Sequence, residues 1–491
     1  MATFIVVNDP KDWTFQIPGV DVVDARNYLT RSEYFEPRSA KLFNFCRSFR
    51  YQSIGYYVSL LAEARGHRPQ PSANAIRDIK SPAIVRQVSQ ELDQLIQRSL
   101  SRLQSSQYTL SVYFGRNVAK SYDRLSLHLF NLFQSPLLKA QFAKDREGHW
   151  LLRSVSTIAL SEVPSSHREF LEEVAAQHFA GRGGRVRRKT PLRHDLAILH
   201  NPDDPEPPSD RQAIKRFVKA AESVGIRAEL VTRDDYARLA EFDALFIRDT
   251  TSVNHYTYRF SSRAASMGLE VIDDPTSIVR CTNKVYLAEL LSRHKIATPR
   301  TLVVHRDNAD VVEAELGLPC VLKKPDSAFS VGVTKARTPE ELQTNLKALL
   351  EESDLIVAQE FLPTTFDWRI GVIDQKPLYA CKYHMAPNHW QIVRRDSNGG
   401  GRYGKVETIP VELAPRKAVR VALKAANLIG SGLYGVDVKQ SNNEFYVIEV
   451  NDNPTIESGE EDSILRDELY RRIMTVFQQR IESRKIGVRE A

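Results

Sequence analysis

Residues 434–453 read YGVDVKQSNNEFYVIEVNDN, and the interpretation of the whole chain starts from this stretch. Its two apolar runs flank the polar segment 440–444, which predicts two strands joined as a hairpin. Glu449 and Asn451 are two positions apart, so on a strand they face the same side, and the pairing brings Asp437 to them. Two carboxylates and one amide suit Mg²⁺, which binds few protein ligands and completes its shell with phosphates and water. The stretch therefore predicts a magnesium site that draws charge from a phosphoryl group in transfer.

Further segments precede this hairpin in a fixed order. They are a helix that begins near Lys284, a basic proline loop at 320–333, a strand that runs into a linker at 355–362, and Asp367-Trp368-Arg369. The ordered set resembles the ATP-grasp superfamily and, within it, the RimK-type glutamate ligases, which add amino acids to a carboxylate. The resemblance covers residues 195–481. It implies an α/β chain in which a small parallel α/β pre-ATP-grasp domain precedes a two-lobed α+β ATP-grasp domain.

The resemblance also implies which residues bind the phosphates. Lys284 and Lys324 match the two phosphate-binding lysines of the family, and each offers a positive charge to the triphosphate. Lys323 points the other way in a strand. It is the less suitable of the adjacent pair, because the family lysine directly precedes a proline.

The loop at 326–332 is expected to close over the phosphates. Its backbone N–H groups and the hydroxyls of Ser327 and Ser330 would bond the phosphate oxygens. The loop departs from the more glycine-rich form of the family, since Gly332 is the glycine that remains.

The residues that follow resemble the nucleoside-binding part of the family. The backbone at Glu360 and Leu362 is expected to bond adenine, with the Glu360 side chain helping at the amino group of the base. Asp367 matches the residue that binds ribose, and Arg369 matches the arginine that faces the substrate or an acyl phosphate. In the alternative interpretation, Asp367 and Arg369 form a structural ion pair. The expected hinge comprises Gln359, Glu360, Phe361 and Leu362.

Two segments depart from the family pattern. RimK-like proteins have an arginine pair followed by Arg-x-Asn where this chain has residues 382–395. This chain offers Lys382, Arg394 and Arg395 there, with Lys382 and Arg394 as the candidate catalytic cations, and the pattern does not decide which of them stabilises the transferred phosphate. Residues 457–460 replace a glycine-rich tail and are expected to influence substrate choice. Between these segments, Asn453 resembles a family residue near the substrate.

Composition sets the class of protein. The chain has 491 residues, 42% of them hydrophobic and 26% charged, which is ordinary for a globular protein of several domains. No apolar run approaches the length of a membrane span, and the first ten residues lack the basic start of a signal peptide. Cys46, Cys281, Cys320 and Cys381 are widely spaced, so we expect reduced thiols, a cytoplasmic location and no zinc site.

The front of the chain carries the positive charge. Residues 1–190 have a net charge of +10, whereas the remainder has −3. An acidic partner for this part is one interpretation, and a solvated basic surface without a partner is the other. Residues 181–191 (GRGGRVRRKTP) predict a flexible basic linker; a nucleic-acid arm is disfavoured because no aromatic residue is present to stack on bases.

Periodicity suggests the elements before the ATP-grasp part. Strands are expected at 3–7, 107–114 and 151–158, with helices at 54–65, 84–103 and 169–179. Beyond the linker, strands at 196–200, 227–231, 242–247 and 269–272 alternate with helices at 211–224 and 257–267, which favours a parallel sheet. The expected domains are an N-terminal basic α/β domain (1–180), a linker (181–194), a pre-ATP-grasp domain (195–280) and an ATP-grasp domain (281–485).

These observations predict an ATP-dependent carboxylate–amine ligase. It would join the amine of an amino acid, with glutamate as a candidate, to a peptide or protein carboxylate through an acyl phosphate, releasing ADP and phosphate. The expected cofactors are ATP and two Mg²⁺ ions, with Mn²⁺ as an alternative metal, and a homo-oligomer without membrane contact is expected. The alternatives are an ATP-grasp small-molecule kinase and a non-catalytic, ATP-regulated ribosome-binding protein.

Overall fold

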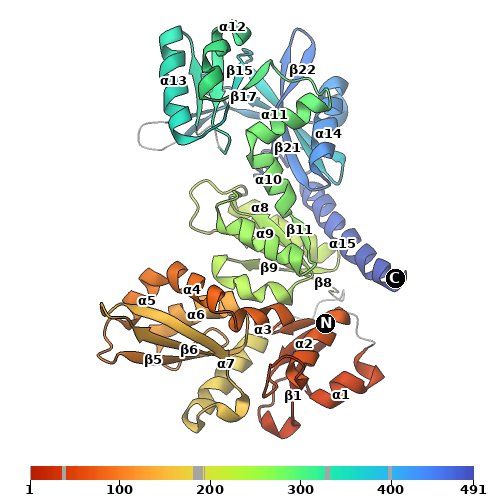
Figure 1. The fold of residues 1–491 in the computed structure, drawn as a ribbon. Coiled ribbons are helices and arrows are strands. Elements are labelled where there is room, and N and C mark those ends of the chain that lie inside the picture. The colour runs from red at the N-terminus through yellow and green to blue at the C-terminus, as the bar shows by residue number, and fades with distance from the viewer. Residues whose placement is uncertain are drawn as a thin grey trace. The chain divides into compact units, whose positions relative to one another are not determined.

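The computed structural model describes residues 2–35, 40–180, 192, 194–326, 332–395 and 401–490. The chain forms two units, one made of residues 1–193 and 234–241 and the other of residues 194–233 and 242–491 (Figure 1). The linker predicted at 181–194 lies outside the described residues except for Leu192 and His194. The inclusion of 234–241 in the first unit was not anticipated from the sequence.

The first unit begins with a parallel four-stranded sheet in the order β2-β1-β3-β4. The predicted helix at 54–65 is α2, and the Ser53 hydroxyl caps it by accepting a hydrogen bond from the Tyr56 N–H. The elements are β1 (Ala2–Val7), β2 (Asp21–Asp24), α1 (Ala25–Thr30), β3 (Ala40–Asn44), α2 (Ile54–Ala64), β4 (Arg68–Gln70) and α3 (Ala73–Ile79).

An antiparallel sheet, β5-β6-β7, completes the first unit. The single helix predicted at 84–103 is wrong, because the chain breaks at Leu92 (φ −95°, ψ 9°) into two helices. Both pack on the same core, so the apolar spacing continues through the break and hides it in the sequence. The elements are α4 (Pro82–Glu91), α5 (Asp93–Leu100), β5 (Gln107–Tyr113), α6 (Asp123–Phe133), β6 (Leu137–Lys144), β7 (Trp150–Thr157) and α7 (Arg168–Ala180).

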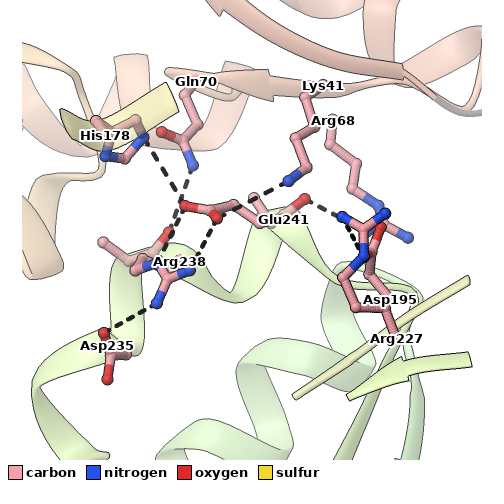
Figure 2. A network of polar contacts seen from close by, with 11 residues as sticks. Lys41, Arg68, Gln70, His178, Asp195, Arg227, Asp235, Arg238 and Glu241 are labelled. Atoms are coloured by element: carbon pink, nitrogen blue, oxygen red, sulfur yellow. Dashed lines mark hydrogen bonds and ion pairs between the residues drawn. The ribbon is translucent and has the colours of Figure 1, made fainter. Parts of the chain in front are cut away.

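Residues 234–241 belong to the first unit through a polar network around Glu241, the last residue of the 3-10 segment η6 (Arg233–Glu241). Figure 2 shows that Arg238, Lys41 and His178 are directed at the Glu241 carboxylate. The distances from its oxygens are 3.2 Å to Arg238 Nη2, 3.8 Å to Lys41 Nζ and 3.8 Å to His178 Nε2. Burial alone raises the pKa of Glu241, but His178, Lys41 and Arg238 together hold that pKa below its ordinary value.

The second unit starts with a parallel sheet in the order β11-β10-β8-β9, as the alternating pattern predicted. The C-terminal helix α15 packs against α8 in the core of this part, where the Phe217 ring lies 4.7 Å from that of Tyr470. The elements are β8 (His194–His200), α8 (Arg211–Ser223), β9 (Ile226–Val231), β10 (Ala244–Arg248), α9 (Tyr256–Ser266), β11 (Glu270–Ile272), α10 (Pro275–Thr282) and α15 (Asp467–Glu490).

The first lobe of the remaining part is an antiparallel sheet, β12-β15-β13-β14. Leu322 and Ala358 face its helical cover and pack with Leu346 of α13. Because side chains alternate along a strand, Val321, Lys323 and Gln359 lie on the opposite face. The elements are α11 (Lys284–Arg293), β12 (Thr301–Val304), α12 (Val312–Leu316), β13 (Cys320–Lys323), β14 (Val333–Ala336), α13 (Pro339–Glu352) and β15 (Ile356–Glu360).

The second lobe is the antiparallel sheet β20-β17-β16-β21-β22, with α14 packed on one face. Trp368, Val436 and Val438 contact this helix layer, which leaves the alternate residues on the other face of the sheet. The elements are β16 (Phe366–Ile373), β17 (Lys376–His384), β18 (Val393–Arg395), β19 (Gly401–Tyr403), β20 (Val406–Ile409), α14 (Arg416–Ile429), β21 (Leu433–Ser441) and β22 (Glu444–Asp452).

The structure confirms the predicted α/β layout with its parallel and two-lobed parts. All four cysteines are buried free thiols. Within the described residues, no helix combines the length and the apolar character needed to cross a membrane.

Candidate active site

The predicted magnesium ligands meet on the β21–β22 hairpin. Asp437 lies directly opposite Glu449, and Asn451 lies opposite Gly435, two positions before Asp437. The Asn451 Nδ2 atom is 3.2 Å from Asp437 Oδ2. Asn442 and Asn443 close the turn with φ values of 50° and 65°, the left-handed conformation that two-residue hairpin turns require. The hairpin therefore holds the three side chains on one face, as the sequence predicted.

These three side chains suit a Mg²⁺ ion that is also bound by a nucleotide. They do not form a complete metal site made of protein ligands alone. Among the described residues, no group of three or more His, Cys, Asp or Glu side chains is arranged to hold a metal ion. Asp437, Glu449 and the Asn451 amide supply two carboxylates and one neutral oxygen. Mg²⁺ binds through one or two carboxylates together with substrate phosphates and water, so the set is sufficient for a nucleotide-bound ion.

Two cations pair with these carboxylates. The Lys284 Nζ atom lies 2.7 Å from Glu449 Oε1, and Arg369 donates from Nε and Nη2 to the two Asp437 oxygens at 2.7 and 2.8 Å. Burial alone raises the pKa of Glu449, but Lys284 and Lys323 hold that pKa below its ordinary value. Glu449 is therefore ionised at neutral pH and ready to bind a cation.

Lys323, and not Lys324, points toward this cluster. The Lys323 ammonium is buried and donates to Gln359 Oε1 at 2.8 Å, and its charge interacts with Glu449 and Lys284. Burial lowers the pKa of Lys323 to about 8. Lys324 instead pairs with Glu352 of α13 at 2.5 Å, on the helical side of the sheet. The two lysines do point opposite ways, as expected, and the strand turns Lys323 toward the cluster. The phosphate-binding role of Lys324 stays a prediction.

The residues that flank the expected phosphate loop are hydrogen-bonded to each other. The Lys324 N–H donates to the Gly332 carbonyl at 2.9 Å, and Gly332 adopts a φ of 73°. Ser327 and Ser330 lie outside the described residues.

The predicted hinge residues line the end of β15. Gln359 uses both ends of its amide, accepting from Lys323 and donating from Nε2 to Thr301 Oγ1 at 2.9 Å. The Glu360 carboxylate lies 2.9 Å from Arg300 Nε, so this side chain is held by Arg300. That pairing does not favour the expected help at the adenine amino group. Leu362 follows in the connection between the lobes.

An aromatic pair with an ammonium group stands beside the hinge. The Phe361 ring lies 5.8 Å from Trp390 in an edge-on arrangement, and Lys335 Nζ lies 4.2 Å from the Phe361 centroid and 5.2 Å from that of Trp390. Sequence reasoning missed Trp390 and Lys335. The signal that could have revealed Trp390 was a tryptophan inside the segment 382–395, which departs from the family pattern.

Asp367 and Arg369 do not pair with each other. Asp367 accepts from Lys439 Nζ at 2.7 Å and from Thr364 Oγ1 at 2.9 Å. Burial raises the pKa of Asp367, and Lys439 opposes that shift without reversing it. The structural ion pair considered as an alternative is therefore absent, since each residue has another partner. Lys439 was missed although it lies two positions after Asp437 on the same strand.

Lys382 lies on the wrong face for the predicted catalytic role. It is opposite Trp368 in the sheet register, whereas Arg369 is opposite Cys381. Its ammonium pairs with Glu407 at 3.2 Å and lies 5.5 Å from the Trp368 ring, on the α14 side. Alternation along the strand therefore places Lys382 on the face opposite Asp437 and Arg369, and its catalytic role stays a prediction.

Arg394 is exposed on the two-stranded sheet β18–β19, opposite Arg402. Within the described part of the chain, no contact joins it to the metal ligands. Its catalytic role therefore stays a prediction.

Asn453 is buried, and both ends of its side-chain amide form hydrogen bonds within the chain. Its Oδ1 accepts from Arg248 Nη1, and its Nδ2 donates to the Asp249 carbonyl, both at 2.6 Å. Arg248 is itself buried and also donates to the Pro454 carbonyl at 2.8 Å. These contacts favour a positioning role for Asn453 over the predicted contact with substrate.

A chain of contacts connects the metal ligands to the tail segment. The Arg369 guanidinium lies 4.7 Å from the Tyr383 ring, and the Tyr383 hydroxyl donates to Glu461. Glu461 also accepts from the Glu457 N–H at 2.7 Å. Burial raises the pKa of Glu461 to about 7. The tail thus reaches the site through Glu461, one residue beyond the segment that sequence reasoning selected.

Comparisons with known proteins agree with this geometry. Residues 25–174 match the RimK-like ATP-grasp N-terminal domain, and residues 281–467 match the RimK-like ATP-grasp domain. A probable alpha-L-glutamate ligase of Vibrio vulnificus (strain YJ016) is 30% identical over 227 residues, which span 45% of this chain and 72% of that protein. Probable alpha-L-glutamate ligase 2 of Shewanella denitrificans is 29% identical over 226 residues, with the same coverage.

A solved RimK domain ATP-grasp protein from Sphaerobacter thermophilus is 17% identical, with a TM-score of 0.43; the match covers 57% of this chain and 98% of that one. The family match and the curated relatives identify the chain as an ATP-grasp enzyme of the carboxylate–amine ligase class. More particularly, the chain belongs to the RimK-like ATP-grasp family and carries the N-terminal domain found with it. Proteins of this family bind ATP and Mg²⁺.

Proposed function

We propose that the protein uses ATP to join the amine of an amino acid to the carboxylate of a peptide or protein. Glutamate is the first donor to test, because the relatives above are named as glutamate ligases. The observation that carries the proposal is the opposed pair Asp437 and Glu449, flanked by Lys284, Lys323 and Arg369. Carboxylates for Mg²⁺ and several cations for phosphate are what a phosphoryl transfer needs in one place.

The chemistry balances in two steps. A carboxylate oxygen of the acceptor attacks the γ-phosphorus of ATP, the bond to the β-phosphate oxygen breaks, and ADP leaves. The amine nitrogen then attacks the acyl carbon, phosphate leaves and the nitrogen loses a proton, so that an amide remains. Mg²⁺, with two ions proposed, lowers the charge on the phosphates when it is bound.

The chain's own residues orient the reactants. Asp437, Glu449 and Asn451 would hold the metal, while Lys284 and Lys323 would exchange their carboxylate and amide partners for phosphate oxygens. Arg369 is held by two hydrogen bonds to the Asp437 carboxylate and stands next to the Tyr383 ring, where it would face the transferred phosphate. We further propose that the basic N-terminal unit serves to bind an acidic partner and that the protein acts as a homo-oligomer.

An oxygen-transfer experiment tests the reaction. The purified chain is incubated with Mg²⁺, ATP, labelled glutamate and a cell extract whose carboxylates carry ¹⁸O, and the products are examined by mass spectrometry. A ligase that forms an acyl phosphate moves one ¹⁸O into inorganic phosphate and adds the mass of glutamate, less one water, to an acceptor. A product that keeps the phosphoryl group would indicate a kinase and would contradict the proposal. So would phosphate release that does not depend on an amine. Asp437→Asn, which removes a metal ligand, is the negative control.

A further inference from the structure

The outer side of α14 carries a hollow that the proposed reaction does not use. It has a volume of about 540 Å³ and lies between α14 and the short 3-10 turn η8 (Val411–Leu413). Its apolar lining comes from Val411, Ala414, Val419 and Leu423. We call this hollow the α14 groove. The inner side of α14 packs on the sheet that carries Asp437 and Glu449 on its other face, so the groove is separated from the metal ligands by the sheet.

Three positive side chains line the groove at regular spacing. Arg416, Arg420 and Lys424 are four positions apart, which places them in one row along the helix with about 6 Å between neighbours. All three are exposed, and none forms an ion pair with any described residue. The groove's one acidic lining residue is Glu412. The row is therefore a strip of three positive charges, beside which the lining supplies a single carboxylate.

The same edge of the groove exposes a large apolar side chain. Leu413 is 75% exposed and directly follows Val411 and Glu412 of the lining. Lys417 belongs to the same helix but pairs with Glu444 at 3.2 Å and does not line the groove. An exposed leucine beside an apolar hollow and a cationic row is a combination typical of surfaces that bind other proteins.

We propose that the α14 groove docks an acidic amphipathic helix of another protein. A helix repeats its side chains every four residues at the same 6 Å, so acidic residues at positions i, i+4 and i+8 of the partner match Arg416, Arg420 and Lys424. Leucine-type residues between them fill the hollow over Val419 and Leu423, and Leu413 covers the edge. Charge complementarity selects an acidic partner, and the apolar floor selects an amphipathic one over a plain polyanion.

A peptide-binding experiment with the full chain tests this. The probe is a fluorescein-labelled synthetic helix of about 14 residues, the length of α14, with Glu at every fourth position and Leu on the adjoining stripe. Fluorescence anisotropy measures its affinity at low and physiological salt. The triple variant Arg416→Glu/Arg420→Glu/Lys424→Glu should weaken binding by about tenfold or more, because each pair is replaced by repulsion. Leu413→Ala should weaken it by a few fold, while Lys417→Glu should leave it unchanged.

Controls separate this proposal from a general effect of charge and from the proposed reaction. A scrambled peptide of the same composition and hexaglutamate should each bind at least tenfold more weakly than the probe; equal binding would overturn the amphipathic-helix proposal. Equal losses in the triple variant and in Lys417→Glu would overturn it as well. Sedimentation that showed a salt-sensitive dimer, abolished by the triple variant, would assign the groove to a second copy and overturn the foreign partner. Unchanged thermal unfolding and Mg²⁺-ATP binding of the triple variant establish that its fold is intact.

Discussion

The ammonium of Lys284 lies 2.7 Å from the carboxylate of Glu449, so a residue expected to bind phosphate and a residue expected to bind metal are partners. If phosphate and Mg²⁺ bind together, phosphate can pair with the lysine and Mg²⁺ with the glutamate, so neither charge is left buried without a partner. Ligand binding at this site is therefore an exchange of partners, which limits the desolvation cost of assembling the charges.

Replacing Glu449 by Gln should disable the enzyme through the metal. The change removes one of two carboxylates and leaves Lys284 and Lys323 facing a neutral amide, so kcat should fall about 100-fold or more. ADP release measured over a Mg²⁺ titration should show a weaker apparent metal affinity. The matched control is Glu407→Gln, which removes the partner of Lys382 on the other face of the sheet. Equal losses in both variants would contradict the assigned metal role.

Lys323→Met and Lys324→Met should separate the two adjacent lysines. Lys323 is buried beside Gln359 and Glu449, and its loss should raise the KM for ATP about 10- to 100-fold. Lys324 pairs with Glu352 on the helical side of the sheet, and its loss should change the KM by less than about twofold, as exposed ion pairs contribute little. Steady-state kinetics with varied ATP measures both. The reverse order would restore the assignment based on the neighbouring proline.

Trp390→Ala should loosen the segment 359–362, which we propose binds the base. The ring contacts Phe361 and the Lys335 ammonium, and aromatic and cation–π contacts of this kind are worth about 0.5–1.5 kcal/mol each. The KM for ATP should rise about 3- to 10-fold with little change in kcat, and Trp390→Phe should recover most of the loss. His389→Ala, in the same loop, serves as the control. Nucleotide titrations followed by tryptophan fluorescence should lose part of their signal in Trp390→Phe.

Acid should weaken the first unit through His178 and Glu241. Burial lowers the pKa of His178, so the unfolded chain takes up this proton at higher pH than the native one, and stability falls as pH drops below about 6.5. The pKa of Glu241 is also lowered, so its contribution is present above about 4.3 and is lost as pH falls further. The protection factors for amide hydrogen exchange in α7 and β3, which correct for the slower intrinsic exchange at low pH, should therefore fall between pH 7 and pH 4.

Glu241→Gln isolates the carboxylate's share of this effect. It should destabilise the first unit by about 2–3 kcal/mol at pH 7, because Lys41 and Arg238 lose their counter-charge. It should also reduce the loss of stability that the first unit shows near pH 4. A variant with the same loss as the parent chain would show that Glu241 does not cause it.

The geometry of the β21–β22 hairpin could be predicted because its determinants are local. Alternation fixes the shared face of Glu449 and Asn451, and the polar turn fixes the pairing that adds Asp437. The order of motifs then located the hinge and Lys284. Local reasoning was enough wherever a strand and its partner are close in sequence.

Other residues lie in surroundings that the sequence did not indicate, and these cases share a different cause. Whether Lys323 or Lys324 faces the site depends on which side of β13 is covered by α13, and that packing joins segments far apart in the chain. The face on which Lys382 lies depends on such packing too, since α14 decides which face of β17 is covered. Asn453 is committed to Arg248, a residue of another sheet whose burial no local pattern announces. Spacing along the chain does not contain this information.

The membership of residues 234–241 in the first unit has a practical outcome for anyone who divides this protein. The segment is flanked on both sides by residues of the second unit, so a cut within 181–193 does not yield two self-sufficient fragments. The C-terminal fragment keeps Glu241 without Lys41 and His178, and the N-terminal fragment keeps a partly buried histidine and lysine without their acid. We expect a split version of this enzyme to be purified intact only when the two halves are co-expressed. A tag on either half should then recover both.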